Sequence, residues 1–259
     1  MKALGALGRW ARARLGTLLG LIGLGAWVLA HCVRPDLWGR VGRAEFFRRL
    51  DQSLIGGLVA TVVLALVAGF GIVFQGLYWF GQVGQRGLLS SLLVSILMRE
   101  VVPLLVGLLI LGRSGTVTIA ELGAMRAAGG IRSLQLSGVD PALVFAVPAA
   151  AAYALAAFTL GVICLTLSLL SGSLVAFSLG DRSVGLFGTV QDVLLAVGPR
   201  DALIFPAKLL AGGALVGITA AFTALSGTEP RATAQLLPIG FVRGVLAVVL
   251  SSVALSLAA

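Results

Sequence analysis

Runs of about 20 or more apolar residues dominate this chain and leave it very few folds. A run of that length spans the hydrocarbon core of a bilayer when it forms an α-helix. Inside lipid a backbone must satisfy its own hydrogen bonds, so we expect helices; a membrane barrel would need alternating polarity, which these runs lack. The 259 residues are 59% hydrophobic and only 11% charged, unlike a soluble domain. The sequence therefore predicts an all-α polytopic membrane protein.

Five transmembrane helices are predicted after an N-terminal segment of residues 1–52. The third apolar run is longer than one crossing requires, so it fits either one tilted helix or a helix broken near Ser168–Ser173. The remaining chain, 53–259, is expected to be one membrane domain. Its predicted spans are about 53–80, 88–112, 141–177, 201–225 and 236–258.

Two basic clusters in residues 1–52 enclose a short apolar stretch, 15–33. If that stretch crossed the bilayer, one cluster would lie on the outer side, against the positive-inside rule. We therefore expect an interfacial or re-entrant elbow helix, with both clusters on the cytoplasmic side.

The basic residues also predict the orientation of the spans. With a cytoplasmic N-terminus and an outer C-terminus, thirteen fall inside and three outside, as the positive-inside rule requires. The thirteen are Lys2, Arg9, Arg12, Arg14, Arg34, Arg40, Arg43, Arg48, Arg49, Arg113, Arg126, Arg132 and Arg231; the three are Arg86, Arg182 and Arg200.

Several classes of function are disfavoured by the composition. The net charge of +9 flanks apolar spans, which indicates anionic lipid rather than nucleic acid. Cys32 and Cys164 lack metal-ligand spacing, and His31 has no acid or cysteine at a useful distance along the chain. Neither Lys2 nor Lys208 belongs to a phosphate-binding loop. We expect no catalytic residue, metal or cofactor in this chain, so any ATPase would be a separate protein.

Charged residues inside predicted spans are the first candidates for a site. Arg99 and Glu100 lie near the middle of the second span, and Pro103 follows them with an expected kink. A charge at that depth costs about 2.5–3.5 kcal/mol, so it faces a cavity or a partner. The pair either lines a substrate cavity or gate, or locks the bundle as a static ion pair. Adjacent helical residues point about 100° apart, which favours two separate partners. Lys208 and Arg243 are further intramembrane polar candidates, with snorkelling to the interface as the alternative.

The connection between the second and third spans, residues 113–140, has helical patterning around Glu121, Leu122 and Met125, with a break at Gly129-Gly130. It is long for a turn. We therefore favour an amphipathic helix on the membrane surface that docks another protein, over a solvated loop.

A dense pattern runs through 98–141: R-E-x-x-P-L-L-x-x-L-L-x-x-G-R-x-G-x-x-x-x-A-E-L-G-x-M-R, followed by I-x-x-L-x-x-x-G-V-D-P. It closely resembles the MlaE/YrbE family of ABC-transporter permeases, and weaker similarity covers roughly 50–259. The residues that carry it are Arg99, Glu100, Pro103, Gly112, Arg113, Gly115, Ala120, Glu121, Leu122, Gly123, Met125, Arg126, Ile131, Leu134, Gly138, Val139, Asp140 and Pro141.

The resemblance implies a phospholipid-transport permease of the bacterial inner membrane that works with an MCE-domain protein. It implies a dimer of permease chains, with a homodimer favoured and a heterodimer left open, and a phospholipid cavity near Arg99, Glu100 and Pro103. Cytoplasmic ATPase subunits, which would bind ATP and Mg, would dock on the coupling segment 113–140. The ATPase contacts implied there are Arg113, Glu121, Leu122, Met125, Arg126 and Asp140.

Two other interpretations stay open at this stage. One is an ATP-independent secondary transporter or channel that uses Arg99 and Glu100 as an ion relay, although the sequence shows no internal repeat. The other is a membrane scaffold that holds an MCE partner without moving lipid. The chain also departs from the family's usual acidic coupling segment at Gly129-Gly130, Arg132 and Gln135, which suggests a divergent ATPase or one half of a heterodimer.

Overall fold

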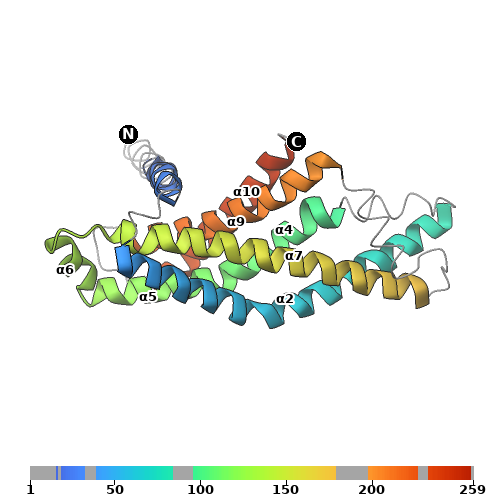
Figure 1. The fold of residues 1–259 in the computed structure, drawn as a ribbon, viewed down its shortest axis with the longest axis horizontal. Coiled ribbons are helices and arrows are strands. Elements are labelled where there is room, and N and C mark those ends of the chain that lie inside the picture. The colour runs from blue at the N-terminus through green and yellow to red at the C-terminus, as the bar shows by residue number, and fades with distance from the viewer. Residues whose placement is uncertain are drawn as a thin grey trace, which may run out of the picture.

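The computed structural model describes residue 16 and residues 19–32, 39–83, 96–178, 198–226 and 233–257. Within those residues the chain is built from helices and contains no strand (Figure 1). Five helices are long and apolar enough to cross a membrane, which confirms the predicted all-α polytopic fold. They are Gly39–Gly76, Leu97–Ala127, Ala142–Val175, Arg200–Leu225 and Gln235–Leu257.

The first long helix, α2 (Gly39–Val83), begins well before the expected start of the first span at residue 53. Its first turns carry four of the basic residues that we had placed in a separate elbow segment, Arg40, Arg43, Arg48 and Arg49. No proline interrupts residues 39–52, and Gly39 has φ +58° at the start of the helix. A helix that meets no breaker continues as long as its side chains pack, and Arg49 and Ser53 are both buried.

A shorter apolar helix, Leu19–Cys32, precedes α2. Its described residues lie within the expected elbow stretch, 15–33, and the interfacial or re-entrant placement of that stretch stays a prediction. Val28 on one face is buried against Leu122 and Ile218 of the bundle. Leu19 and Ile22 on another face are exposed.

The second span is longer than predicted, because one helical rod continues past residue 112 to Ala127. It consists of η3 (Leu97–Val101), α4 (Val102–Ile110), η4 (Leu111–Gly115) and α5 (Thr116–Ala127), where η denotes a π-helical turn. The segment that we expected on the membrane surface therefore begins inside the bundle.

The continuity of this rod has a packing reason. Thr118, Ile119 and Leu122 of α5 are buried, and α5 packs against α9 and α10. The predicted break at Gly129-Gly130 is present, since Gly129 has φ +80° and ends the rod in the left-handed region. Only residues 128–140, with the short helix α6 (Gly130–Leu136), form the surface connection, instead of the whole of 113–140.

The third run is one unbroken helical rod, formed by η5 (Ala142–Ala146) and α7 (Val147–Ser178), so the alternative of a break near Ser168–Ser173 is wrong. The last two predicted spans correspond to α9 (Pro199–Leu225) and α10 (Thr233–Leu257). Half of the sixteen basic residues used to predict the orientation lie outside the described residues: Lys2, Arg9, Arg12, Arg14, Arg34, Arg86, Arg182 and Arg231.

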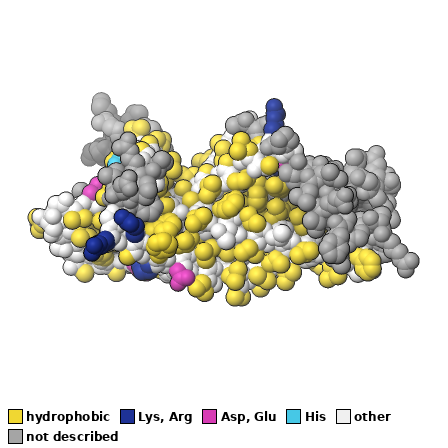
Figure 2. All heavy atoms as spheres, in the orientation of Figure 1, with side chains coloured by type: hydrophobic (Ala, Val, Ile, Leu, Met, Phe, Trp, Pro, Cys, Tyr) yellow, Lys and Arg dark blue, Asp and Glu magenta, His cyan; other side chains and the backbone are white. Residues whose placement is uncertain are grey.

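Helix α7 runs along α2 on one side and α9 on another (Figure 1). Glycines allow the closest approach: a Cβ on Gly217 would come within 2.6 Å of the backbone of Ala150. Large apolar side chains remain exposed along α2 and α10, such as Val59 and Leu250, and Figure 2 shows hydrophobic side chains over the middle of the visible face. That surface suits contact with lipid.

Candidate functional site

A buried lysine organises the first polar cluster, at the end of the bundle where η3 meets α9 and α10. The Lys208 side chain is 1% exposed, and its Nζ lies 3.0 Å from Glu100 Oε1. Nζ also donates 2.5 Å hydrogen bonds to Ser256 Oγ and to the carbonyl oxygen of Arg99. Ser252 donates to the second carboxylate oxygen of Glu100 at 3.4 Å. We call Arg99, Glu100, Asp201, Lys208, Ser252 and Ser256 the Glu100 cluster.

Pro103 explains part of this geometry. Proline has no backbone N–H, so in a helix the carbonyl four residues earlier, here that of Arg99, loses its usual donor. Lys208 donates to that carbonyl instead. The π-helical turn η3 also lies here, with the N–H of Val102 bonded to the carbonyl of Leu97. Such turns interrupt regular helices frequently at functional sites.

Arg99 points to a different partner from its neighbour Glu100. Its Nε donates to Asp201 Oδ1 at 2.6 Å, and its Nη2 donates to Asp201 Oδ2 at 3.0 Å. This two-bond arrangement holds a guanidinium and a carboxylate in a fixed orientation. The sequence-based prediction of two separate partners for Arg99 and Glu100 is confirmed.

A pocket of about 280 Å³ opens beside the Glu100 cluster. Arg99, Arg200 and Lys208 contribute cationic groups to its wall, and Glu100 contributes a carboxylate. Guanidinium and ammonium groups bind phosphate and carboxylate oxygens well. The pocket therefore offers hydrogen-bond donors to an anionic group. Two of its cations, Arg99 and Lys208, are held in place by ion pairs with Asp201 and Glu100.

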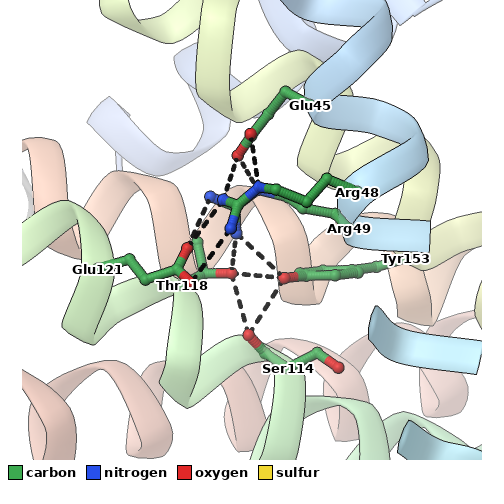
Figure 3. A network of polar contacts seen from close by, with 7 residues as sticks. All are labelled: Glu45, Arg48, Arg49, Ser114, Thr118, Glu121 and Tyr153. Atoms are coloured by element: carbon green, nitrogen blue, oxygen red, sulfur yellow. Dashed lines mark hydrogen bonds and ion pairs between the residues drawn. The ribbon is translucent and has the colours of Figure 1, made fainter. Parts of the chain in front are cut away.

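A second polar cluster lies near the start of α2 (Figure 3). The Arg49 side chain is 1% exposed; its Nε donates to Glu45 Oε1 at 2.6 Å, and a second nitrogen lies 3.5 Å from Glu121 Oε2. Arg49 also donates to Thr118 and, at 3.3 Å, to the hydroxyl of Tyr153. Arg48 pairs with the same two carboxylates from the exposed side. We call Glu45, Arg48, Arg49, Ser114, Thr118, Glu121 and Tyr153 the Arg49 cluster.

The Arg49 cluster joins three helical rods through polar side chains. Their burial is possible because they form hydrogen bonds with one another. Tyr153 of α7 donates to the carbonyl of Ser114, 3.1 Å away. Ser53 of α2 donates to Ser114 Oγ at 3.0 Å. Every buried side-chain nitrogen or oxygen in the described residues has a hydrogen-bond partner. A buried charge needs such partners, and here they connect α2 and α7 with η4 and α5 of the second-span rod.

The six predicted ATPase contacts occupy different environments, and their role stays a prediction. Leu122 is 2% exposed in the core, and Glu121 faces the two arginines of α2. Arg126 donates to the carbonyl of Ala224 at 3.2 Å. Arg113 donates to the carbonyl of Gly56, Met125 is half-buried, and Asp140 accepts from the N–H of Ala142 at 2.9 Å.

Snorkelling to the interface was the alternative for the two remaining intramembrane candidates, Lys208 and Arg243, and the structure places their side chains differently. Lys208 turns inward to Glu100. Arg243 is half-buried, donates to Thr223 Oγ1 at 3.4 Å and lies over the ring of Phe222. His31 stacks on Trp27.

Sequence reasoning missed Asp201, Ser252 and Ser256 in the Glu100 cluster, and all of the Arg49 cluster except Glu121. Asp201 stands 102 positions from its partner Arg99, so no local pattern connects them. The sequence held a weak signal for Arg49. It lies just before the first predicted span, and a charged residue that enters a membrane helix needs a partner.

The matched family profile, Permease MlaE, covers residues 46–258. The protein TRIGALACTOSYLDIACYLGLYCEROL 1, chloroplastic, of Arabidopsis thaliana is 22% identical over 191 residues, which are 74% of this chain and 54% of that protein. The intermembrane phospholipid transport system permease protein MlaE of Haemophilus influenzae is 28% identical over 140 residues, 54% of this chain and 52% of that protein. The chain thus spans about half the length of these relatives.

Proposed function

Because this chain belongs to the MlaE permease family, we propose that it is the permease subunit of an ABC transporter of the bacterial inner membrane. It moves phospholipid between that membrane and an MCE-type carrier. A second permease chain, the same or a related one, completes the lipid cavity. The name of the Haemophilus influenzae relative, an intermembrane phospholipid transport permease, supports the substrate class.

The observation that carries the proposal is the Glu100 cluster with its pocket. Two elements distant in sequence, η3 and α9, bring three cationic side chains and two carboxylates together inside the matched region. A phospholipid head group carries a phosphate, which Arg99 and Lys208 can bind through charge-assisted hydrogen bonds. In this proposal Glu100 and Asp201 hold those cations in position until the phosphate competes for them.

The ATPase contact is proposed at α6. Arg132 and Gln135 are exposed there, and Leu136 is 82% exposed, whereas Leu122 is enclosed by the bundle. Closure of an ATPase dimer on α6 would be transmitted through the rod that ends at Ala127, whose other end carries Arg99 and Glu100. That is a coupling between two sites through one rigid element.

The experiment is to purify the chain with the products of neighbouring genes in mild detergent, then identify proteins and lipids by mass spectrometry. An ATPase subunit, an MCE protein and phospholipid together would support the proposal and tell a homodimer from a heterodimer. Transport by reconstituted vesicles is then compared for the native chain, Glu100→Gln and Arg99→Lys. The second variant keeps the charge but loses the two-bond pairing.

Each alternative predicts a different result in the same assays. Transport without ATP would favour a secondary transporter or channel that uses Arg99 and Glu100. A scaffold would be favoured if the MCE protein copurified, no lipid were bound to this chain, and lipid transport by the vesicles were unchanged in Glu100→Gln.

A further inference from the structure

A groove lies between the helix Leu19–Cys32 and the bundle, at the opposite end of the second-span rod from the Glu100 cluster. Its volume is about 480 Å³, within the roughly 300–1,000 Å³ of small-molecule sites. Gly20, Gly23 and Trp27 form one wall, and Phe222 and Leu225 of α9 form another. The lining is almost entirely apolar.

The groove is open at Gly23, whereas at Gly20 the helix lies close to Phe222, where a Cβ would come within 3.2 Å of the ring. A Cβ on Gly23 would meet no atom within 4 Å, so a side chain there would point into empty space. On the next helical face Val28 closes the contact between this helix and the bundle, where it packs with Leu122 and Ile218. The helix is therefore packed against the bundle around Val28 and is separated from it at Gly23.

The surroundings of the groove identify its occupant. Leu19 and Ile22 on the outside of the helix are exposed, as are apolar side chains of the spans, so this surface meets lipid. An apolar groove open to lipid is filled by acyl chains rather than by water, because its walls offer almost no hydrogen-bond partners.

A cationic side chain lies at the end of the groove. Arg126 donates to the carbonyl of Ala224, in the last turn of α9, and the next two residues, Leu225 and Ser226, line the groove. Among the described residues Arg126 makes no ion pair. An arginine with spare donors next to an acyl-chain groove matches the chemistry of a phospholipid, whose phosphate follows directly on its chains.

We propose that this groove is a phospholipid-binding site separate from the pocket at Glu100. One acyl chain lies between Gly23 and Phe222, and the phosphate accepts hydrogen bonds from Arg126. The bound lipid fills the gap at Gly23 between the N-terminal helix and the bundle, and so adds to the contacts that hold this helix in place. The site does not require that the protein transport lipid.

The test uses the full chain, with any copurifying subunits, and a phosphatidylglycerol that carries a diazirine at the end of one acyl chain. After illumination, cross-linked peptides are mapped by mass spectrometry. We expect cross-links in residues 20–27 and 222–226. Gly23→Leu, which fills the groove, should lower the cross-linking there about tenfold, equivalent to roughly 1.4 kcal/mol.

The matched control is Gly71→Leu, because a Cβ on Gly71 also meets nothing within 4 Å but lies on the exposed surface of α2. It should leave cross-linking in the groove unchanged. Arg126→Gln tests the phosphate contact without filling the groove, and should lower cross-linking several-fold while thermal unfolding shows that the chain is folded.

Equal cross-linking at 20–27 and 222–226 in the native chain and in folded Gly23→Leu would overturn the proposal, as would cross-links of the native chain found only elsewhere. An unchanged yield in Arg126→Gln would overturn the phosphate contact. Loss of lipid at the Glu100 pocket, mapped by peptides around residues 99–100, would be read separately, so the two sites can fail independently.

Discussion

Two adjacent arginines of α2 have very different environments, because a helix turns each side chain about 100° from the previous one. The Arg48 side chain is 51% exposed, whereas that of Arg49 is 1% exposed, although both pair with Glu45 and Glu121. The two arginines have the same charge and the same partners, but they do not contribute equally to the free energy of unfolding. Burial decides it, since water screens the outer pair and not the inner one.

Arg49→Ala should lower the free energy of unfolding by about 3 kcal/mol or more, because it breaks a buried ion pair and takes the inner cation away from the largely buried carboxylate of Glu45. Arg48→Ala should change it by less than about 1 kcal/mol. Thermal or denaturant unfolding in detergent measures both. Similar losses from the two substitutions would contradict the burial argument.

Lys208 and Glu100 should behave as one unit. Lys208→Met leaves Glu100 without its cation and the Arg99 carbonyl without its donor, and Glu100→Gln leaves Lys208 as a buried charge with weaker partners. A double-mutant cycle on unfolding free energy should give a coupling of about 0.5–3 kcal/mol. Strictly additive effects would mean that the pair contributes nothing specific to stability.

At the scale of elements, α7 and α9 approach one another at positions that only glycine permits. A Cβ on Gly213 would collide with the carbonyl of Tyr153, whereas a Cβ on the adjacent Gly212 would meet nothing within 4 Å. Substitution of these two adjacent glycines therefore distinguishes two effects of alanine on stability: overpacking between helices at Gly213, and higher helix propensity alone at Gly212.

Gly213→Ala should destabilise the bundle by about 1–3 kcal/mol through overpacking. Gly212→Ala should be neutral or stabilise it by up to about 1 kcal/mol, because alanine favours the helix. Melting temperatures of the two purified variants test this pair. If Gly213→Ala were as stable as Gly212→Ala, α7 and α9 would not pack as closely as the structure has them.

The helix Leu19–Cys32 also has a chemical reporter of its docking. Cys32 Sγ lies 3.6 Å from the carbonyl of Val147, and burial raises the pKa of its thiol to about 11. Thiolate, the reactive form, is therefore scarce at neutral pH. In a Cys164→Ser background, maleimide labelling of Cys32 should be slow near neutral pH and should rise about tenfold for each pH unit up to the pKa.

Labelling of Cys32 at the rate of a free cysteine with an ordinary pKa would show that the helix does not stay docked. Acid-denatured or detergent-unfolded protein, brought to the same pH, provides the reference rate.

For the whole molecule, the described basic residues are distributed unequally between its two ends. Arg40, Arg43, Arg126 and Arg132 lie toward the end that carries α5 and α6, as the Lys and Arg side chains visible in Figure 2 illustrate. Arg99 and Arg200 lie at the other end, beside Asp201. By the positive-inside rule, α6 is expected to face the cytoplasm.

A membrane-impermeant thiol reagent should therefore label Leu136→Cys only in inverted vesicles, in a background without Cys32 and Cys164. Arg200→Cys, at the other end of the bundle, is the matched position and should be labelled from the opposite side. Labelling of both from the same side would contradict the topology.

Much of the architecture was predictable because membrane insertion depends on local sequence. The number of spans, the ends of α9 and α10 and the break at Gly129 follow from apolar length and from glycine's access to positive φ. So did the separate partners of Arg99 and Glu100, since adjacent helical side chains diverge. The family resemblance rested on the same stretch, and the matched profile confirms it.

Tertiary contacts decided what local sequence could not. The rod continues through α5 because α9 and α10 cover Ile119, and because Arg49 and Tyr153 bond the buried Thr118. A segment with amphipathic patterning therefore became part of the bundle. Asp201 as the partner of Arg99, and Tyr153 as a partner of Arg49, come from helices far along the chain. Lys208 turns inward because two acceptors lie there: the Arg99 carbonyl, which Pro103 leaves without a backbone donor, and the carboxylate of Glu100. The hydropathy of the sequence shows a lysine within a span but does not show either acceptor.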